Sequence, residues 1–381
     1  MEEAKRVLRH AVEEGALPFA VAMVGSSNGI TLSTSAGEAA KGRPAAEDTV
    51  FRIFSMSKAI GSLAALILID RGVLSPETPV ADLLPDWADL PVLDGWNGDE
   101  PILRPQRSVA TLRHLATHTS GIEYDSWNAD MMKYITVRRP TPAMSGRLEG
   151  LRVPLTFDPG TRWGYGLSTD WLGRMVEAAD GRRIDTFCRE EIFDPLGMTD
   201  TVFEPDGRED RLADVKMRAG EGAFRPIRIA PPTQPEVYGM GHALYSTAPD
   251  YMRFLRMVLN GGELDGNRIL SPETMALMMQ DQMRGLSFQK MITASPPLSA
   301  DVDLFPGTKV THSLAFLRNE TDIPGRRSAG SLTWAGVCNT HYWIDPARDT
   351  CAVLMTQSLP FLDPAMAATY EAFERAVYAG H

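Results

Sequence analysis

The chain has 381 residues, of which 44% are hydrophobic and 23% charged, so it is long enough for two or three folding units with a sizeable core. These proportions are average for globular proteins and exclude collagen-like, coiled-coil and disordered chains. The 38 basic and 49 acidic residues give a net charge of -11, and basic residues cluster no further than pairs, so nucleic acid is not expected as a partner.

The N-terminal segment predicts a surface helix over 2–14, ended by Gly15. Its alternating charges do not match a secretory signal. The longest apolar run, 59–69, is too short to cross a bilayer, so it predicts a buried helix and no membrane partner. The three cysteines are widely spaced and form no C-x-x-C pair, which gives no sign of a disulfide framework. Together these features favour a cytoplasmic protein.

Two short extended segments, Phe19–Val24 and Ile30–Thr34, predict a β-hairpin with a five-residue connection. The long middle segment, about 75–235, is rich in proline and glycine. Within it, helical patterns occur at Thr111–Thr117, Thr169–Ala179 and Ile184–Phe193. The middle of the chain therefore predicts a mostly helical insert with loops.

Regular patterns return after the middle segment. Helices are predicted over 249–259, 274–283 and 366–378. Before the last of these helices come four predicted strands, His312–Leu317, Ser331–Trp334, Asn339–Ile344 and Cys351–Thr356.

Strands near both chain ends with helices between them predict an α/β (α+β) protein. Residues 1–75 together with 235–381 are expected to form one discontinuous domain, an antiparallel sheet flanked by helices. Residues 76–234 are expected to form a mainly helical domain. The active site is expected between the two domains.

Two motifs suggest chemistry that their context does not support. Residues 25–29 match the G-x-S-x-G nucleophile elbow, but the elbow joins a strand to a helix, whereas a second strand follows here. We interpret these residues as a hairpin turn. His114 and His118 have the spacing of an H-E-x-x-H zinc site, but position 115 is leucine and no third ligand is evident. The sequence therefore predicts neither a metal nor another cofactor.

A third motif, Ser55-Met56-Ser57-Lys58, lies between an extended segment and the apolar helix. Residues three apart share a helix face, so the Lys58 amine can lie against the Ser55 hydroxyl. A lysine partly buried near a second polar group can lose its proton at neutral pH and act as a general base. For this motif alone, a capping serine followed by a solvated lysine remains an alternative.

Further motifs follow Ser55 in the chain. They are Leu-Arg-His-Leu-Ala-Thr-His-Thr-Ser-Gly at 112–121, Phe-Asp-Pro-Gly-Thr-Arg-Trp-Gly-Tyr-Gly-Leu at 157–167, Gly-Met-Gly at 239–241 and Trp-Ala-Gly-Val-Cys-Asn-Thr at 334–340. In this order they resemble the serine β-lactamase and penicillin-binding-protein superfamily, over the segment from Thr49 to Met355. Within it, the chain resembles the family VIII carboxylesterases, the esterase branch similar to class C β-lactamases. The resemblance implies the β-lactamase/transpeptidase-like fold.

The resemblance also implies roles for individual residues. Ser55 would be the acyl-accepting nucleophile and Lys58 its proton partner. Tyr165 resembles the tyrosine of the family's Y-x-N/S element, which moves protons together with the lysine, and an adjacent ammonium favours the phenolate form of a tyrosine. The backbone N–H groups of Ser55 and Val337 would form the oxyanion hole.

Two departures from the β-lactamase pattern bear on the substrate. Trp334-Ala335-Gly336 replaces K-T-G, whose lysine binds the carboxylate of β-lactams, and an indole offers an apolar plane instead. Gly336 would let the backbone approach the substrate closely. Leu167 stands where the family has the asparagine of Y-x-N. Both changes favour a neutral ester. Further aromatic wall candidates, for which ordinary packing is an equal alternative, are Trp127, Tyr238 and Tyr245.

The sequence thus predicts a cofactor-independent serine hydrolase that acts on small-molecule carboxylic esters of short to medium chain length. An acyltransferase that uses the same acyl-enzyme stays open, as does a β-lactamase or D-amino-acid peptidase or amidase of the same fold. A non-catalytic penicillin-recognising sensor is disfavoured, because Ser55, Lys58 and Tyr165 are all present. The sequence does not predict the oligomeric state.

Overall fold

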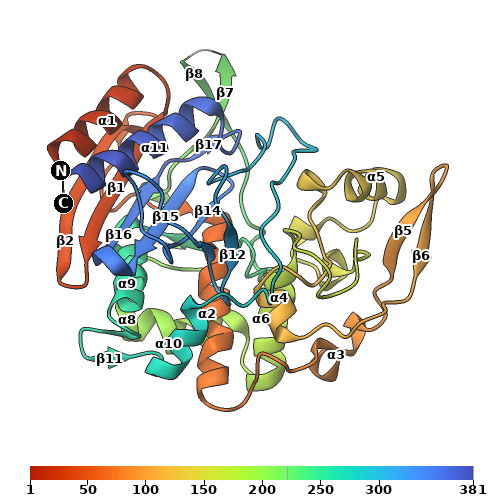
Figure 1. The fold of residues 1–381 in the computed structure, drawn as a ribbon. Helices are drawn as coiled ribbons and strands as arrows, with labels where there is room; N and C mark the ends of the chain where they lie inside the picture. Colours follow the sequence, from red (N-terminus) through yellow and green to blue (C-terminus); the bar gives the residue numbers. More distant parts are fainter. Residues whose placement is uncertain (221, 381) are drawn as a thin grey trace.

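An eight-stranded antiparallel sheet forms the centre of the fold in the computed structural model, which describes residues 1–220 and 222–380. Its order is β12-β13-β14-β15-β16-β1-β2-β3. The strands are β1 (Phe19–Ser26), β2 (Gly29–Ala40), β3 (Arg43–Pro44), β12 (Val310–His312), β13 (Leu317–Asn319), β14 (Leu332–Gly336), β15 (Thr340–Asp345) and β16 (Thr350–Met355). Strands from the two chain ends therefore meet in the middle of the sheet, as Figure 1 shows, and the predicted antiparallel sheet is confirmed.

Strand β1 is apolar on both faces because both faces of the sheet are covered. Its residues Ala20, Ala22 and Val24 belong to a cluster with α1 (Glu2–Glu13) and α11 (Pro364–Ala379). These two helices lie side by side on one face of the sheet (Figure 1). The alternate residues of β1 face the main core on the other side.

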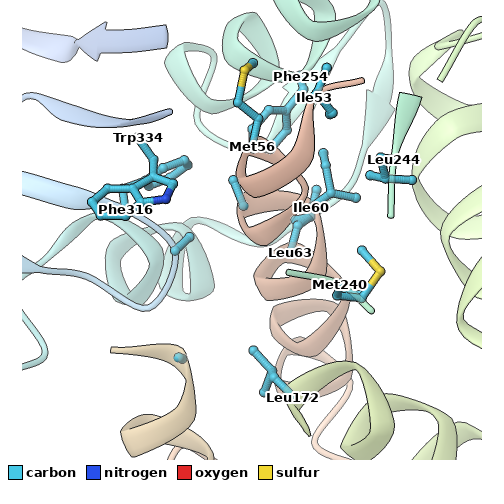
Figure 2. Packing of buried hydrophobic residues seen from close by; sticks show 14 of the residues in the cluster. Ile53, Met56, Ile60, Leu63, Leu172, Met240, Leu244, Phe254, Phe316 and Trp334 are labelled. Atoms are coloured by element: carbon cyan, nitrogen blue, oxygen red, sulfur yellow. The ribbon is translucent and has the colours of Figure 1, made fainter. Parts of the chain in front are cut away.

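Helix α2 (Ser57–Asp70) is the centre of the main core, and every residue from Ser57 to Leu68 is buried. Figure 2 shows its side chains between Met240 and Leu244 on one side and Phe316 and Trp334 on the other. The apolar run was therefore correctly predicted as a buried helix. Among the described residues, no helix has the length and apolar character needed to cross a bilayer.

Helices of the middle segment and the segment after it surround α2. Helix α6 packs on α2 and on α4, and α9 packs on β1 and β16. The helices are α3 (Val80–Leu83), α4 (Leu112–Ala116), α5 (Ala129–Arg138), α6 (Ser168–Asp180), α7 (Ile184–Cys188), α8 (Asp194–Leu196), α9 (Ala248–Leu259) and α10 (Pro272–Met279). The proposed domain boundaries at 76 and 234 stay a prediction.

The middle segment also contains two antiparallel hairpins that the sequence did not predict. They are β5 (Val92–Asn97) with β6 (Glu100–Arg104) and β7 (Val215–Gly220) with β8 (Ala223–Ile227). Both second strands contain a proline, which weakens a strand prediction although edge strands tolerate it. The β5–β6 hairpin projects from the helical side of the molecule (Figure 1). The remaining short strands are β4 (Phe51–Arg52), β9 (Tyr245–Ser246), β10 (Glu263–Leu264), β11 (Asn267–Arg268) and β17 (Ser358–Leu359).

Three local predictions differ from the structure. The β1–β2 turn has two residues rather than five, because Ser26 pairs directly with Gly29. The strand predicted over 312–317 is wrong, since the Ser313 hydroxyl accepts two backbone N–H groups and turns the chain between β12 and β13. Helix α10 ends at Met279 instead of continuing to residue 283.

Candidate active site

Ser55 lies in a sharp turn between strand β4 and helix α2. The turn is a 3₁₀ segment, Phe54–Met56, closed by a hydrogen bond from the Met56 N–H to the Ile53 carbonyl. Phe54 has a φ of 41°, in the left-handed region that non-glycine residues rarely adopt. Such strain is typical of functional turns. Both neighbours of Ser55 are buried, whereas Ser55 itself is half-buried at the edge of a cavity.

The Lys58 amine is buried and contacts three oxygen atoms. Its Nζ atom lies 3.2 Å from Ser55 Oγ, 3.2 Å from Tyr124 Oη and 2.8 Å from the Gly241 carbonyl oxygen. The carbonyl can only accept, so it orients the amine. An uncharged amine in this position can donate to Gly241 and Tyr124 and turn its lone pair to the Ser55 proton. The Lys58 amine therefore lies against the Ser55 hydroxyl, as expected from their three-residue spacing.

Tyr165 lies beside the lysine, but its hydroxyl points elsewhere. Lys58 Nζ is 4.8 Å from the centre of the Tyr165 ring, and the Tyr165 hydroxyl accepts a hydrogen bond of 3.1 Å from Trp334 Nε1. Sequence reasoning missed Tyr124, whose hydroxyl contacts the amine. Tyr124 follows the His-Thr-Ser-Gly segment by three residues, which was the available signal.

The environment of Tyr124 keeps it a neutral phenol. Burial raises the pKa of Tyr124 well above its ordinary value, and the nearby Asp170 carboxylate adds to this effect. Its hydroxyl can therefore both donate and accept a hydrogen bond at neutral pH. A neutral Tyr124 can give its proton to one neighbour only if it accepts a proton from another.

Trp334 does more than present an apolar plane. It is buried, its ring packs 4.9 Å from that of Tyr165, and its N–H holds the Tyr165 hydroxyl. Gly336, two residues further along β14, lies against the turn that carries Ser55, because a Cβ at this position would overlap the Ile53 carbonyl oxygen. This glycine is therefore required for packing between β14 and the nucleophile turn, and not only for approach to a substrate.

Two cavities of unequal size meet at Ser55 and Val337, the residues predicted to supply the oxyanion hole. The large cavity measures about 270 Å³ and the small one about 20 Å³. Among other residues, the large cavity is lined by Tyr124, Trp127, Met131, Ile135, Leu167 and His242. The small cavity shares Ser55, Trp127 and Val337 with the large one and is otherwise lined by Tyr165, Met291, Val302, Leu304, Trp334, Ala335 and Phe361.

The other aromatic wall candidates lie elsewhere. Tyr238 is not among the described residues that line the two cavities; it packs against Phe203, and its hydroxyl donates to Glu204. Tyr245 belongs to strand β9, where the Arg52 guanidinium covers its ring. Local packing accounts for both tyrosines.

The two histidines of the H-x-x-x-H motif serve different purposes. His114 Nδ1 accepts the Thr111 N–H and caps helix α4. His118 is buried with its ring 5.0 Å from that of Tyr165, and burial holds the pKa of His118 well below its ordinary value. His118 is thus a neutral neighbour of the site, whereas His114 serves the start of helix α4.

We expect replacement of either Tyr124 or Tyr165 by phenylalanine to lower kcat for an ester by about 10²-fold, because the Tyr124 hydroxyl contacts the Lys58 amine and Tyr165, whose hydroxyl is held by Trp334, lies beside the same amine. The KM should change much less, since both rings stay in place. Steady-state kinetics with a chromogenic ester checks this. Tyr238→Phe is the matched control and should keep the wild-type kcat. A wild-type kcat in Tyr124→Phe would show that Tyr124 only fills space.

Comparison with known proteins agrees with this architecture. The family model described as Beta-lactamase matches residues 4–376. Monacolin J acid methylbutanoyltransferase of Aspergillus terreus is 30% identical over 350 residues, which cover 88% of this chain and 83% of the relative. Lovastatin esterase of Penicillium rubens is 32% identical over 352 residues, covering 88% and 86%.

A solved structure has the same fold. Simvastatin synthase (LovD) from Aspergillus terreus, in its unliganded selenomethionyl form, gives a TM-score of 0.85 at 29% identity and covers 99% of this chain and 98% of that chain. The resemblance seen in the sequence motifs is thereby confirmed for the superfamily and the fold. The chain, a serine enzyme with the β-lactamase fold, belongs to the Beta-lactamase family.

Proposed function

We propose that the protein cleaves short-chain carboxylic esters through an acyl-enzyme on Ser55. One observation carries the proposal: two cavities of unequal size meet at Ser55, whose hydroxyl lies 3.2 Å from the buried Lys58 amine. The small cavity, as the narrower of the two, would take a short acyl group. The large cavity then takes the alcohol part of the ester.

The proposed reaction runs in two steps. Lys58 accepts the Ser55 proton as Ser55 Oγ attacks the ester carbonyl, and the developing oxyanion faces the N–H groups of Ser55 and Val337. The C–O bond to the alcohol breaks, and the alcohol oxygen takes up the proton from the site. Water then attacks the acyl-enzyme, which releases the acid and restores Ser55. Tyr165 and Tyr124 would carry protons between these oxygens and Lys58.

The cavity walls disfavour an anionic substrate. No lysine or arginine occurs among the described residues that line either cavity, most of these residues are apolar, and Glu123 and Asp125 line the large cavity. The Trp334 N–H already bonds Tyr165 and is not free to bind a carboxylate. A β-lactam or a peptide C-terminus would therefore lack a cationic partner. A preference for neutral esters is also what the resemblance to family VIII carboxylesterases implies. A cytoplasmic location stays a prediction of the sequence.

A second candidate is acyl transfer from the same acyl-enzyme to an alcohol. It is favoured by the 30% identical relative named as a methylbutanoyltransferase and by the size of the large cavity, which can hold an acceptor alcohol. The two functions share every residue up to the acyl-enzyme. They differ in whether water or an alcohol attacks it.

Turnover of chromogenic acetate, butyrate and octanoate esters beside a chromogenic cephalosporin tests the proposal. We expect the short esters to be cleaved, the octanoate ester to react more slowly, and the cephalosporin to react barely at all. Intact-protein mass after a pulse of ester should show one acyl group on the protein. Added bulky alcohol that diverts the acyl group from acid to new ester would establish the transferase. Faster turnover of the cephalosporin would overturn the neutral-ester proposal.

A further inference from the structure

A buried carboxylate lies behind the catalytic lysine. Asp170, in the first turn of α6, is fully buried, and its Oδ1 atom accepts the Gly241 N–H at 3.0 Å. His242 Nδ1 lies 3.4 Å from the same oxygen, and His242 itself borders the large cavity. Among the described residues, neither nitrogen of the His242 ring has a hydrogen-bond partner. Asp170 and His242 are therefore a polar pair with few other contacts.

The glycines of the Gly239-Met240-Gly241 motif fit this carboxylate closely. A Cβ on Gly239 would overlap Asp170 Oδ1, and a Cβ on Gly241 would lie 2.6 Å from Asp170 Oδ2. The latter would also lie 3.0 Å from the Tyr124 hydroxyl. Gly241 thus separates Asp170 from Tyr124. The Gly241 carbonyl oxygen accepts a hydrogen bond from the Lys58 amine. The loop is folded around the Asp170 carboxylate on one side and the lysine on the other.

Asp170 keeps its negative charge in this position. Burial by itself would raise the pKa of Asp170, but the imidazole of His242, the charge of Lys58 and the Gly241 N–H outweigh burial and hold the pKa below its ordinary value. The first turn of a helix also favours a negative charge. Gly241 therefore links a fixed negative charge to the Lys58 amine: its N–H donates to Asp170, and its carbonyl oxygen accepts from Lys58.

We propose that Asp170 is a positioning residue for the reaction at Ser55. Its carboxylate fixes the 239–242 loop so that the Gly241 carbonyl holds Lys58 against Ser55. Its charge stabilises the ammonium that exists after Lys58 has taken the Ser55 proton. The inference rests on the proposed acylation of Ser55 and adds a residue to it, with His242 as the partner that keeps Asp170 ionised.

Other titratable groups face Lys58 besides Asp170. Tyr124 lies in the loop after α4, Tyr165 precedes α6, and His118 lies at the end of α4. Of these three, two are phenols and one is an imidazole kept neutral by burial. Asp170 adds a negative charge to this group. Removal of that charge should therefore destabilise the ammonium that forms when Lys58 takes the Ser55 proton.

The test is the rate at which a fluorophosphonate labels Ser55, measured as a function of the fluorophosphonate concentration. Asp170→Asn keeps an oxygen for the Gly241 N–H but removes the charge. We expect the maximal labelling rate of this variant to fall about 10²-fold, while the concentration that gives half of this rate stays at the wild-type value. Asp180→Asn, at the other end of the same helix in an ion pair with Arg182, should keep the wild-type maximal rate and half-saturating concentration.

A wild-type labelling rate in Asp170→Asn would overturn the proposal, as would a fall that comes only from a higher half-saturating concentration. If this variant does not fold, His242→Asn decides. Loss of the imidazole removes the partner that keeps Asp170 ionised, so the maximal labelling rate should fall in this variant too, and a wild-type maximal rate contradicts the proposal. Labelling needs no ester, so a protein that is labelled at Ser55 but turns over no ester would refute the proposed function and still test this inference.

Discussion

Replacing Ser55 with alanine is expected to lower the turnover of a butyrate ester by about 10⁴-fold or more and to remove the acyl adduct from the intact-protein mass. Ser55 Oγ stands where both cavities and the Lys58 amine meet, which places it to attack a carbonyl whose two substituents occupy the two cavities. The residual rate should reflect binding and the oxyanion hole alone. Steady-state kinetics and mass measurement check the two expectations together.

Two other serines supply controls for this experiment. Ser57 lies two residues away, but its buried hydroxyl accepts the Leu244 N–H, so Ser57→Ala should keep the acyl adduct. Ser27, in the G-x-S-x-G segment, lies in the β1–β2 turn, where its hydroxyl donates to Asp349. Ser27→Ala should be fully active. If Ser55→Ala still formed the adduct, the nucleophile would lie elsewhere, and loss of activity in Ser27→Ala would identify it.

The largest effect on stability is expected from Glu374→Gln. Glu374 and Arg327 are both fully buried, with Arg327 Nε 2.7 Å from Glu374 Oε1, and Arg326 contacts the same carboxylate. Removal of one charge leaves the Arg327 guanidinium buried without its counter-ion. We expect the free energy of unfolding to fall by about 3 kcal/mol, measured by urea denaturation. Ester turnover by the folded variant should be unchanged, because the pair lies outside both cavities.

Glu371→Gln, on the same helix, is the control. Its ion pair with Arg375 is half exposed, so its loss should cost less than about 1 kcal/mol. The buried pair also sets a pH dependence. Burial alone would raise the pKa of Glu374, but Arg327 and Arg326 outweigh burial and hold the pKa below its ordinary value.

This stabilisation is therefore fully present above the ordinary pKa of a glutamate and is lost as the pH falls through the lower, folded-state pKa. Below the ordinary pKa of a glutamate, the wild type should lose stability more steeply with falling pH than Glu374→Gln. Equal slopes for the two proteins would contradict the assigned role of this carboxylate.

The parts of the fold and site that the sequence predicted well are those fixed by short-range pattern. Helices α1 and α2 carry long periodic or apolar runs and begin within a residue or two of the predicted positions. Ser55 and Lys58 meet because a three-residue separation at a helix start is a local geometry. The β5–β6 and β7–β8 hairpins were missed because proline weakens their strand pattern, and packing against the rest of the protein outweighs that preference.

The rest of the candidate site depends on which side chains the fold brings together. Tyr124 reaches Lys58 from a loop more than sixty residues further along the chain, and no spacing in the sequence reports that contact. The direction of the Trp334 N–H was also unpredictable, since an indole can present either its plane or its donor. Tyr238, a reasonable wall candidate by composition, is held by Glu204 instead.

The pairing of β1 with β16 places Val21 opposite Met355, so the central seam of the sheet joins the beginning of the chain to its end. During synthesis, the edge of β1 that pairs with β16 must stay open until β16 has left the ribosome, because contacts this distant in sequence close last. A product that terminates before β14 would carry Ser55 and Lys58 but neither Val337 nor the Trp334 support of Tyr165. The fold thereby ties the completion of the candidate site to late strands, and chains that stop earlier should depend on chaperones to shield the open edge of β1.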